Sequence, residues 1–395
     1  MPGSVIVSTA RTPIGKLSGA LASLGATDLG GHAIRAALAR GGVDAEQVDY
    51  VYMGQVIQAG TGQMPARQAA TKGGIPLSVP SIGLNKACLS GIDAIYLADL
   101  MIQAGDAEVV IAGGMESMSQ APYLLKKARE GYRMGNGELL DSLLDDGLMC
   151  GLDGIHMGEG TEKYVQAHGA ISREHMDELS AMSHERAANA AKDGRFSEIE
   201  PIEIPQRKGD PIVIADDEGI RPGTTAESLG NLRPAFMKDG SITAGNASQI
   251  SDGAAAVVVM SRAKAEELGV QPIAELLSFG LVAGPDTSLL TQPSRAIKRA
   301  LEPIDTKVSD IDLFELNEAF AAVGVASMLD LGVGDDIVNV NGGAISLGHP
   351  IGMSGTRVVL TIIDELRRRG GGIGAAALCG GGGQGDALIV RVPTS

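Results

Sequence analysis

The feature that most constrains the fold of this chain is an internal repeat. A helical segment, Ala33–Leu38, is followed by the strand-like Asp49–Met53, and the same order recurs in Ala296–Leu301 and Asp312–Leu316. The leucine that ends the first segment and the aspartate that begins the second are eleven residues apart in both copies. A single match of this kind could arise by chance, so the remaining part of each copy decides whether the repeat is real.

A second echo lies further along each copy. Ser90-Gly91 precedes a helical stretch and a strand that ends in glycines, and Ser354-Gly355 likewise precedes Val358–Arg369 and Gly374–Gly383. Two echoes in the same order indicate two similar α/β halves. The alternation of strands and helices predicts a largely parallel sheet that is covered on both faces.

The repeat also divides the chain into regions. Residues 1–118 are expected to form the N-terminal half, completed by about 248–270, and residues 271–395 are expected to form the C-terminal half. Between them, residues 119–247 are loop-rich and more charged. We interpret this stretch as a loop domain inserted into the first half.

Charge and cysteine content exclude several classes of protein. The net charge of −16 argues against binding to nucleic acid or to an anionic membrane surface. No uninterrupted apolar stretch approaches the roughly 20 residues of a membrane span, and no signal peptide is apparent. Three cysteines without regular spacing give neither a disulfide framework nor a zinc site. We therefore expect a soluble cytoplasmic protein that holds no metal.

The segment Asn85–Gly91 is the first candidate for chemistry. Apolar residues recur at helical spacing from Ile92 to Ile102, which places Cys88 at or just before a helix N-terminus. The partial positive charge there favours a thiolate, the better nucleophile. The alternative is an ordinary buried thiol, because free cysteine is among the most buried residue types.

The second half contributes three polar clusters, each where a predicted strand ends. They are Asn317-Glu318-Ala319-Phe320, the glycine-rich loop Gly342–Gly352 with His349, and Ala377–Gly383 with Cys379. Ligands of open α/β sheets gather at the carboxyl ends of strands, so these clusters could converge on one site. The alternatives are structural, because Asn317 could cap a helix, His349 could satisfy its own loop and Cys379 could belong to the core.

The glycine run Gly380–Gly383 points to exposed backbone N–H groups. Glycines lose more conformational entropy on folding than other residues, so a run of them implies a close approach or N–H groups that could bind a developing oxyanion. Gly380-x-Gly382-x-x-Gly385 also fits a dinucleotide fingerprint. Only ten residues follow Gly385, too few for the βαβ unit that such a site needs, so we reject that role.

Together these motifs closely resemble those of the thiolase family, in order and spacing and over essentially the whole chain. The matching segments are NKACLSG at 85–91, NEAF at 317–320, GGAISLGHPIGMSG at 342–355 and CGGGGQG at 379–385. Two further segments, His156-Met157-Gly158 and Thr243–Ser248, resemble the short-chain, biosynthetic members. The resemblance implies a five-layer α-β-α-β-α fold of two stacked βαβαβαββ halves with an inserted loop domain.

The resemblance implies an acyltransferase, an acetyl-CoA C-acetyltransferase that condenses two acetyl-CoA into acetoacetyl-CoA and CoA by a ping-pong mechanism. Cys88 would carry the acetyl group as a thioester. His349 would activate Cys88 and, with a water held by Asn317, would bind the thioester oxygen of the second substrate. Cys379 would remove the α-proton of that substrate, and the N–H groups of Cys88 and Gly381 would stabilise the oxyanion.

The same resemblance implies the contacts to CoA. The pantetheine would lie near Leu148, His156, Met157, Ala244, Ser248, Ala319 and Phe320, and the nucleotide near Arg221 and Ser228. No cofactor is implied, because the CoA thioesters are substrates. The segment Gln249-Ile250-Ser251-Asp252 replaces the more frequent Gly-Ile/Leu-Asn-Asp, and Met353 stands where a small residue is common. These departures leave the acyl-chain preference open.

Other functions remain as alternatives. The nearest is a degradative 3-ketoacyl-CoA thiolase for longer chains, and a remote one is a non-catalytic thiolase-like protein that binds lipid or CoA. Cys150 matches no catalytic motif, and we interpret it as structural. Thiolases of the short-chain type are usually homotetramers, built as dimers of dimers, so we expect that assembly here.

Overall fold

A mixed sheet of ten strands forms the centre of the computed structural model, which describes residues 4–394. The strands lie in the order β14-β15-β16-β13-β1-β12-β5-β3-β4, with β2 paired to β12. The N-terminal half contains β1 (Val5–Arg11), β2 (Gly15–Lys16), α1 (Ala26–Gly41), β3 (Tyr50–Gly54), α2 (Pro65–Lys72), β4 (Ser81–Leu84), α3 (Ser90–Ala104), β5 (Val109–Ser117), β12 (Ser251–Met260) and α7 (Arg262–Leu268). β12 lies between β1 and β5, the place expected of a segment that completes this half.

The C-terminal half repeats this plan. It contains β13 (Ala274–Ala283), α8 (Gln292–Leu301), β14 (Leu313–Leu316), α9 (Ala321–Leu331), α10 (Ala344–Leu347), α11 (Ser354–Arg369), β15 (Gly372–Gly380) and β16 (Gln384–Val392). The repeated aspartates are equivalent in space. Asp49 donates its N–H to Val109 O and accepts the N–H of Val109 on Oδ2, both at 2.9 Å. Asp312 does the same with Ile373, at 2.9 and 2.7 Å. The prediction of two similar halves is confirmed.

The prediction of a largely parallel sheet is wrong. Only β3–β4, β3–β5 and β14–β15 are parallel pairs, whereas the other six pairs of this sheet are antiparallel. A short turn over 381–383 folds β16 back along β15, and such a short connection joins only antiparallel strands. The first strand of each half, β1 or β13, also runs antiparallel to its neighbours.

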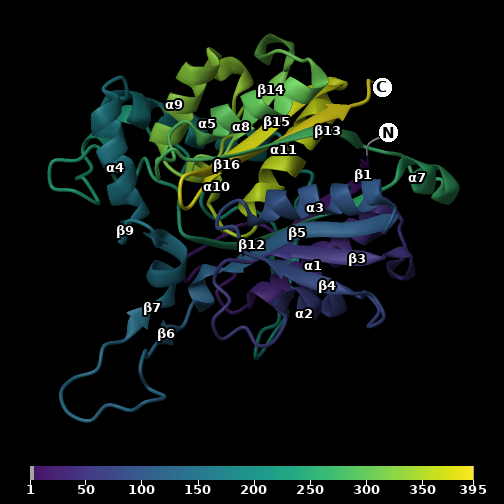
Figure 1. Cartoon of the computed structure of the whole chain (residues 1–395), viewed down its shortest axis with the longest axis horizontal. Helices are drawn as coiled ribbons and strands as arrows, with labels where there is room; N and C mark the ends of the chain where they lie inside the picture. Colours follow the sequence, from purple (N-terminus) through teal and green to yellow (C-terminus); the bar gives the residue numbers. More distant parts are fainter. Residues whose placement is uncertain (1–3, 395) are drawn as a thin grey trace.

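Helices α3 and α11 form the layer between the two halves, and Figure 1 shows them between the blue N-terminal strands and the yellow C-terminal strands. Their apolar side chains share one core with strands of both halves. Two glycines permit the close approach of the helices. A Cβ on Gly91 would lie 2.7 Å from the backbone nitrogen of Thr356, and one on Gly355 would lie 2.4 Å from that of Ile92.

One segment of the described chain, Ala87–Ala104, is long and apolar enough to cross a membrane by length and composition alone. Half of it is buried, and α3, which makes up most of it, packs against α11 and β5. The segment is therefore accounted for as a core helix.

The inserted region lies along one side of the two halves and contains α4 (Met157–His168), α5 (Arg173–Lys192), α6 (Ala226–Gly230) and the short strands β6 (Tyr123–Leu124), β7 (Leu140–Asp141), β8 (Met149–Cys150), β9 (Ile155–His156), β10 (Ile202–Ile204) and β11 (Ile212–Ile214). Buried Arg11 joins it to the N-terminal half by ion pairs to Glu198 at 3.0 Å and to Asp217 at 2.7 Å. The β6–β7 hairpin extends away from the body of the protein (Figure 1).

The equivalent aspartates give a test of the repeat. We expect Asp49→Ala and Asp312→Ala each to lower the free energy of unfolding by about 1–2 kcal/mol, because each removes an acceptor of strand N–H groups. Urea unfolding followed by circular dichroism measures this. Asp44→Ala is the matched control, since its exposed side chain makes no capping hydrogen bond. If Asp49→Ala or Asp312→Ala left the free energy of unfolding unchanged, this result would contradict the structural equivalence of the two aspartates.

Candidate active site

Cys88 lies in a tight turn two residues before α3, so the predicted position at a helix N-terminus is confirmed. The preceding Ala87 has a φ of 51°, a left-handed conformation that costs a non-glycine residue about 1–2 kcal/mol. Two side chains hold this turn. Asn85 Oδ1 accepts the N–H of Ala87 at 3.1 Å, and Ser90 Oγ accepts the N–H of Lys86 at 2.8 Å and donates to Ala87 O at 2.6 Å.

Lys86 connects this turn to the other half of the protein. Its ammonium group lies 3.0 Å from Asp93 of α3 and 2.8 Å from the buried Asp386 of β16. Because these carboxylates come from different halves, the ion pairs fix the nucleophile segment relative to the end of β15, where Cys379 lies.

His349 is oriented by a chain of hydrogen bonds whose direction can be assigned. Arg357 can only donate, so its contact at 3.3 Å identifies the Asn317 atom as Oδ1 and turns Nδ2 toward His349 Nε2, 3.4 Å away. Ser354 Oγ donates to Pro350 O at 2.9 Å and therefore accepts from His349 Nδ1 at 2.6 Å. His349 thus carries its proton on Nδ1, and its unprotonated Nε2 accepts from Asn317 Nδ2.

Burial dominates the ionisation of the three reactive groups. It raises the pKa of Cys88 to about 12, against a smaller lowering by the backbone N–H of Cys88, and nearby Glu116 raises it further. Burial and the charge of Cys88 raise the pKa of Cys379, while burial and the charge of Arg357 lower the pKa of His349 to about 3. The helix N-terminus favours a thiolate, as expected, but desolvation outweighs this effect and keeps the pKa of Cys88 raised.

Two adjoining cavities contain most of the predicted site residues. The inner one, of about 110 Å³, is lined by Cys88, His349, Cys379, Gly381, Leu148, His156, Met157, Ser248, Ala319 and Phe320, among others. The outer one, of about 440 Å³, shares Leu148, His156, Ser248, Phe320 and His349 with it and adds Arg221 and Ala244. Asn317 contacts His349 from behind the inner cavity. The three reactive groups therefore face one small chamber with a larger approach channel.

Ser228 is the exception among the predicted contacts. It lines neither cavity, and its hydroxyl donates to Thr225 O at 2.7 Å in the capping box of α6. Its contact with a nucleotide stays a prediction. Cys150 is buried and also lines neither cavity.

An aromatic group forms one wall of the channel. The ring of His156 stacks on Phe236, with centroids 4.7 Å apart, and Phe236 meets Phe320 edge to face at 6.1 Å. A Cβ on Gly158 would lie 2.6 Å from the Phe236 ring, so glycine is needed there. His156 Nδ1 accepts the N–H of Gly158 at 3.0 Å, which orients the imidazole. The segment His156-Met157-Gly158 thus builds this wall.

Sequence motifs did not reveal several residues around the site. Phe236 and Lys16 line the outer cavity and Leu289 lines the inner one, but none belongs to a motif that would have singled it out. The one signal for Lys16 was that it is a basic residue in a strongly acidic chain. For Phe236 and Leu289 there was none, because only packing brings them to the cavities.

Two buried carboxylates hold the backbone around the site. Glu116 accepts N–H groups of Val56 at 3.0 Å, Ile57 at 3.2 Å and Gly352 at 3.0 Å. Burial raises the pKa of Glu116 to about 8, although these N–H groups oppose the rise. Glu318 likewise holds the loop before His349 by accepting from Ser183, Asn339 and the N–H of Ile345.

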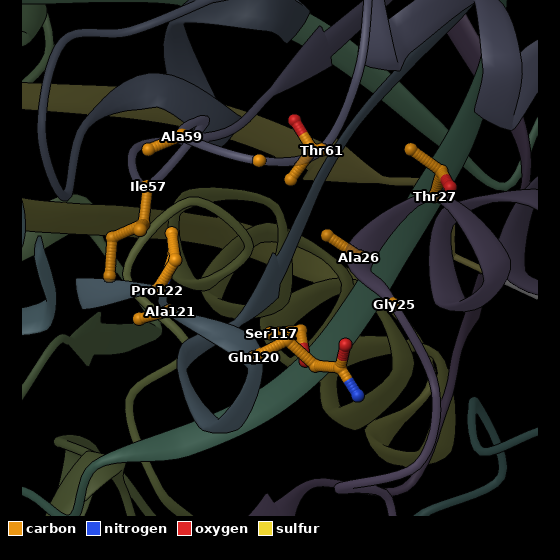
Figure 2. Close-up of a pocket in the computed structure, with 11 residues that line it drawn as sticks. Gly25, Ala26, Thr27, Ile57, Ala59, Thr61, Ser117, Gln120, Ala121 and Pro122 are labelled. Carbon is orange, nitrogen blue, oxygen red and sulfur yellow. The ribbon is translucent and has the colours of Figure 1, made fainter. Parts of the chain in front are cut away.

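A separate cavity of about 240 Å³ lies at the start of α1 (Figure 2), and its lining, which includes Thr27, Thr61 and Gln120, holds none of the predicted site residues. Within residues 4–394, no group of three or more His, Cys, Asp or Glu side chains could hold a metal ion.

Comparison with known families agrees with the two-part chain. The family described as "Thiolase, N-terminal domain" matches residues 4–263, and "Thiolase, C-terminal domain" matches residues 270–392. The chain belongs to the thiolase family. It is an acyltransferase, and the predicted family is confirmed.

Similar proteins extend over the whole chain. A probable acetyl-CoA acetyltransferase of Mycolicibacterium smegmatis is 58% identical and covers 98% of this chain and 100% of its own length. An acetyl-CoA acetyltransferase of Cupriavidus necator is 50% identical, with 99% and 100% covered. The crystal structure of the Bacillus anthracis acetyl-CoA acetyltransferase matches with a TM-score of 0.96 at 41% identity, covering 100% of this chain and 99% of that one. The predicted thiolase fold is confirmed.

The ionisation of Cys88 gives a prediction for the thiolase without substrate. We expect its alkylation by iodoacetamide to rise about tenfold per pH unit from about pH 7 to about pH 10, because only the thiolate reacts and its fraction grows below a pKa near 12. Mass spectrometry of the Cys88 peptide measures the rate, and Cys88→Ala is the control. A plateau by about pH 8 would show instead a thiol activated at rest.

Proposed function

We propose that this thiolase is an acetyl-CoA C-acetyltransferase, which reversibly condenses two acetyl-CoA into acetoacetyl-CoA and CoA. The observation that carries the proposal is that Cys88, His349 and Cys379 line one chamber. A nucleophile, a base and a second thiol in one place suit a reaction in two half-reactions. Relatives named acetyl-CoA acetyltransferase, at 50–58% identity over nearly the full chain, support it.

In the first half-reaction Cys88 attacks the acetyl carbonyl. The thiol proton passes to His349 Nε2, which is unprotonated at rest and releases its contact with Asn317 Nδ2, and the new thiolate forms a bond to the carbonyl carbon. The C–S bond to CoA breaks, and the departing sulfur takes the proton of Cys379. CoA leaves as a thiol, with the acetyl group on Cys88 and a thiolate at Cys379. The raised pKa of Cys379 suits a group that begins as a thiol.

In the second half-reaction Cys379 acts as the base. Its thiolate removes a proton from the methyl carbon of the second acetyl-CoA, and the resulting carbanion attacks the acetyl carbon on Cys88. The carbon–sulfur bond to Cys88 then breaks, releasing acetoacetyl-CoA, and Cys88 recovers its proton from His349. A raised pKa makes the Cys379 thiolate a strong base, which the weakly acidic carbon requires.

Backbone and polar groups would stabilise the negative charge that develops. The N–H groups of Cys88 and Gly381 would bind the tetrahedral oxyanion, since both residues line the inner chamber. His349 and a water on Asn317 would bind the enolate oxygen of the second substrate, consistent with the contact between these two side chains. No cofactor is needed for any of these steps.

The channel accounts for binding of the CoA thioester. The aromatic wall of His156, Phe236 and Phe320 would contact the pantetheine, together with Leu148, Met157, Ala244, Ser248 and Ala319. Arg221 would face the nucleotide at the mouth of the channel. A guanidinium supplies the local positive charge that an anionic ligand needs on a protein of net charge −16.

We further propose that the enzyme is a homotetramer of the cytoplasm. The β6–β7 hairpin carries exposed apolar side chains, Tyr123, Met134 and Leu139, far from the core of its own chain (Figure 1). Such an arm suits contact with other subunits. The negative net charge supports the absence of nucleic-acid and membrane partners.

The two thiols are expected to separate the half-reactions. With acetyl-CoA, Cys379→Ala should accumulate acetyl-enzyme and lose about 10²- to 10⁴-fold in condensation, because CoA can leave as a thiolate whereas the α-proton needs a base. Cys88→Ala should form no acetyl-enzyme. Intact-protein mass and acetoacetyl-CoA formation measure these effects. Cys150→Ala is the matched control and should keep full activity; an acetyl group on Cys88→Ala would contradict the mechanism.

Chain length distinguishes the proposal from the degradative alternative. Thiolysis of acetoacetyl-CoA should exceed that of 3-ketohexanoyl- and 3-ketodecanoyl-CoA by at least about tenfold in kcat/KM, because the chamber of about 110 Å³, lined by Leu148, Met157 and Leu289 among others, leaves little room for a longer chain. Met157→Ala should reduce the difference in kcat/KM between acetoacetyl-CoA and the longer substrates. A preference for the longer substrates would assign the enzyme to the degradative class.

A further inference from the structure

The side chain of Gln249, next to Ser248 at the channel, makes four polar contacts. Its Nε2 lies 3.0 Å from Gly219 O, 2.9 Å from Ile345 O and 3.3 Å from Ser346 O. These three carbonyls identify the nitrogen, because they can only accept. The oxygen Oε1 therefore faces the opposite way, where it accepts from Arg221 Nη2 at 3.4 Å.

Arg221 is a free cation at the wall of the outer cavity. No carboxylate among residues 4–394 forms an ion pair with it, in contrast to Lys16 on the same wall, which lies 3.8 Å from Glu218. Its backbone is fixed, because its N–H donates to the buried His184 Nδ1 at 3.2 Å. Burial and the charge of Arg221 lower the pKa of His184 to about 4, so this acceptor stays neutral. Gln249 is thus the side chain that directs the guanidinium.

The backbone of Gln249 reaches the catalytic loop as well. Its carbonyl accepts the N–H of His349 at 3.1 Å and the hydroxyl of Ser251 at 2.9 Å. Two of the carbonyls that hold its side chain, those of Ile345 and Ser346, belong to the same loop as His349. Gln249 is therefore anchored to the loop that carries His349, and its side chain extends from there to Arg221.

We propose that Gln249 is a positioning residue that holds Arg221 toward the phosphate groups of the CoA nucleotide. The inference rests on the proposed function, which supplies the CoA thioester. A neutral amide oxygen orients the guanidinium without neutralising it, whereas a carboxylate in that place would compete with the phosphates. A guanidinium that is already oriented loses less side-chain entropy on binding. The usual glycine at this position would leave Arg221 without this contact.

Two substrates that differ only in the nucleotide test the proposal. Gln249→Met keeps the length of the side chain and removes its hydrogen bonds. We expect its KM for acetyl-CoA to rise roughly 3- to 10-fold, its kcat to stay within about twofold, and its KM for S-acetylpantetheine, which lacks the nucleotide, to stay unchanged. Arg221→Ala should also raise KM for acetyl-CoA alone, and the double variant should be no worse than Arg221→Ala.

Controls separate positioning from folding. Gln103→Met makes the same chemical change on the exposed side of α3, about 20 Å along the helix from Ser90, and should leave both KM values unchanged. Gln249→Ala is the second variant should Gln249→Met fail to match the thermal unfolding midpoint of the unchanged protein.

Three results would overturn the inference. Equal rises in KM for both substrates would show that Gln249 supports the fold of the channel, and independent effects of the two substitutions would show that it acts without Arg221. An unchanged KM for acetyl-CoA would show that the contact does not matter. A lack of condensation by the unchanged protein with either thioester would overturn the proposed function, and this inference with it.

Discussion

The close contact between α3 and α11 is the constraint on which the rest of the structure depends. It is possible because Gly91 and Gly355 have no Cβ where the helices meet, and any side chain at either position would collide with the backbone of the other helix. Cys88 stands just before α3, and Ser354, which orients His349, begins α11. Packing the two helices together therefore also brings Cys88 and His349 to the same chamber. Stability and geometry of the site arise from the same contact.

Burial determines the chemistry once this geometry exists. In this largely buried chamber, Cys88 and Cys379 favour the thiol and His349 favours the neutral imidazole, although a helix N-terminus lies nearby. The resting site thus holds groups that are uncharged. Charge would develop only when a thioester enters and backbone N–H groups can stabilise it. Desolvation is consistent with a thiol that is protected until substrate is bound.

The approach channel differs from the chamber, because its lining changes in character along its length. Its inner part is apolar and aromatic, which suits a pantetheine chain, and its outer part carries cations on a strongly acidic protein. The residues that line it come both from the inserted region, as Arg221 and Phe236 do, and from the two halves, as Lys16 and Phe320 do. The two halves thus carry Cys88, His349 and Cys379, while the insertion supplies part of the lining of both cavities. Gln249 links these two parts, because its backbone contacts the His349 loop and its side chain contacts Arg221.

The sequence by itself determined the repeat and the thiolase family, and it predicted Cys88, Asn317, His349 and Cys379 as site residues. These depend on local patterns and on the order of the motifs. It did not determine the strand directions, which depend on how each half closes around β1 and β13. Nor could it show that Cys88 is a thiol at rest, since desolvation is a property of the assembled chamber. The contacts of Arg357 with Asn317 and of Gln249 with Arg221 join residues 40 and 28 positions apart. Only tertiary packing decides such contacts, because it alone brings these distant residues within hydrogen-bond distance, which no local sequence pattern records.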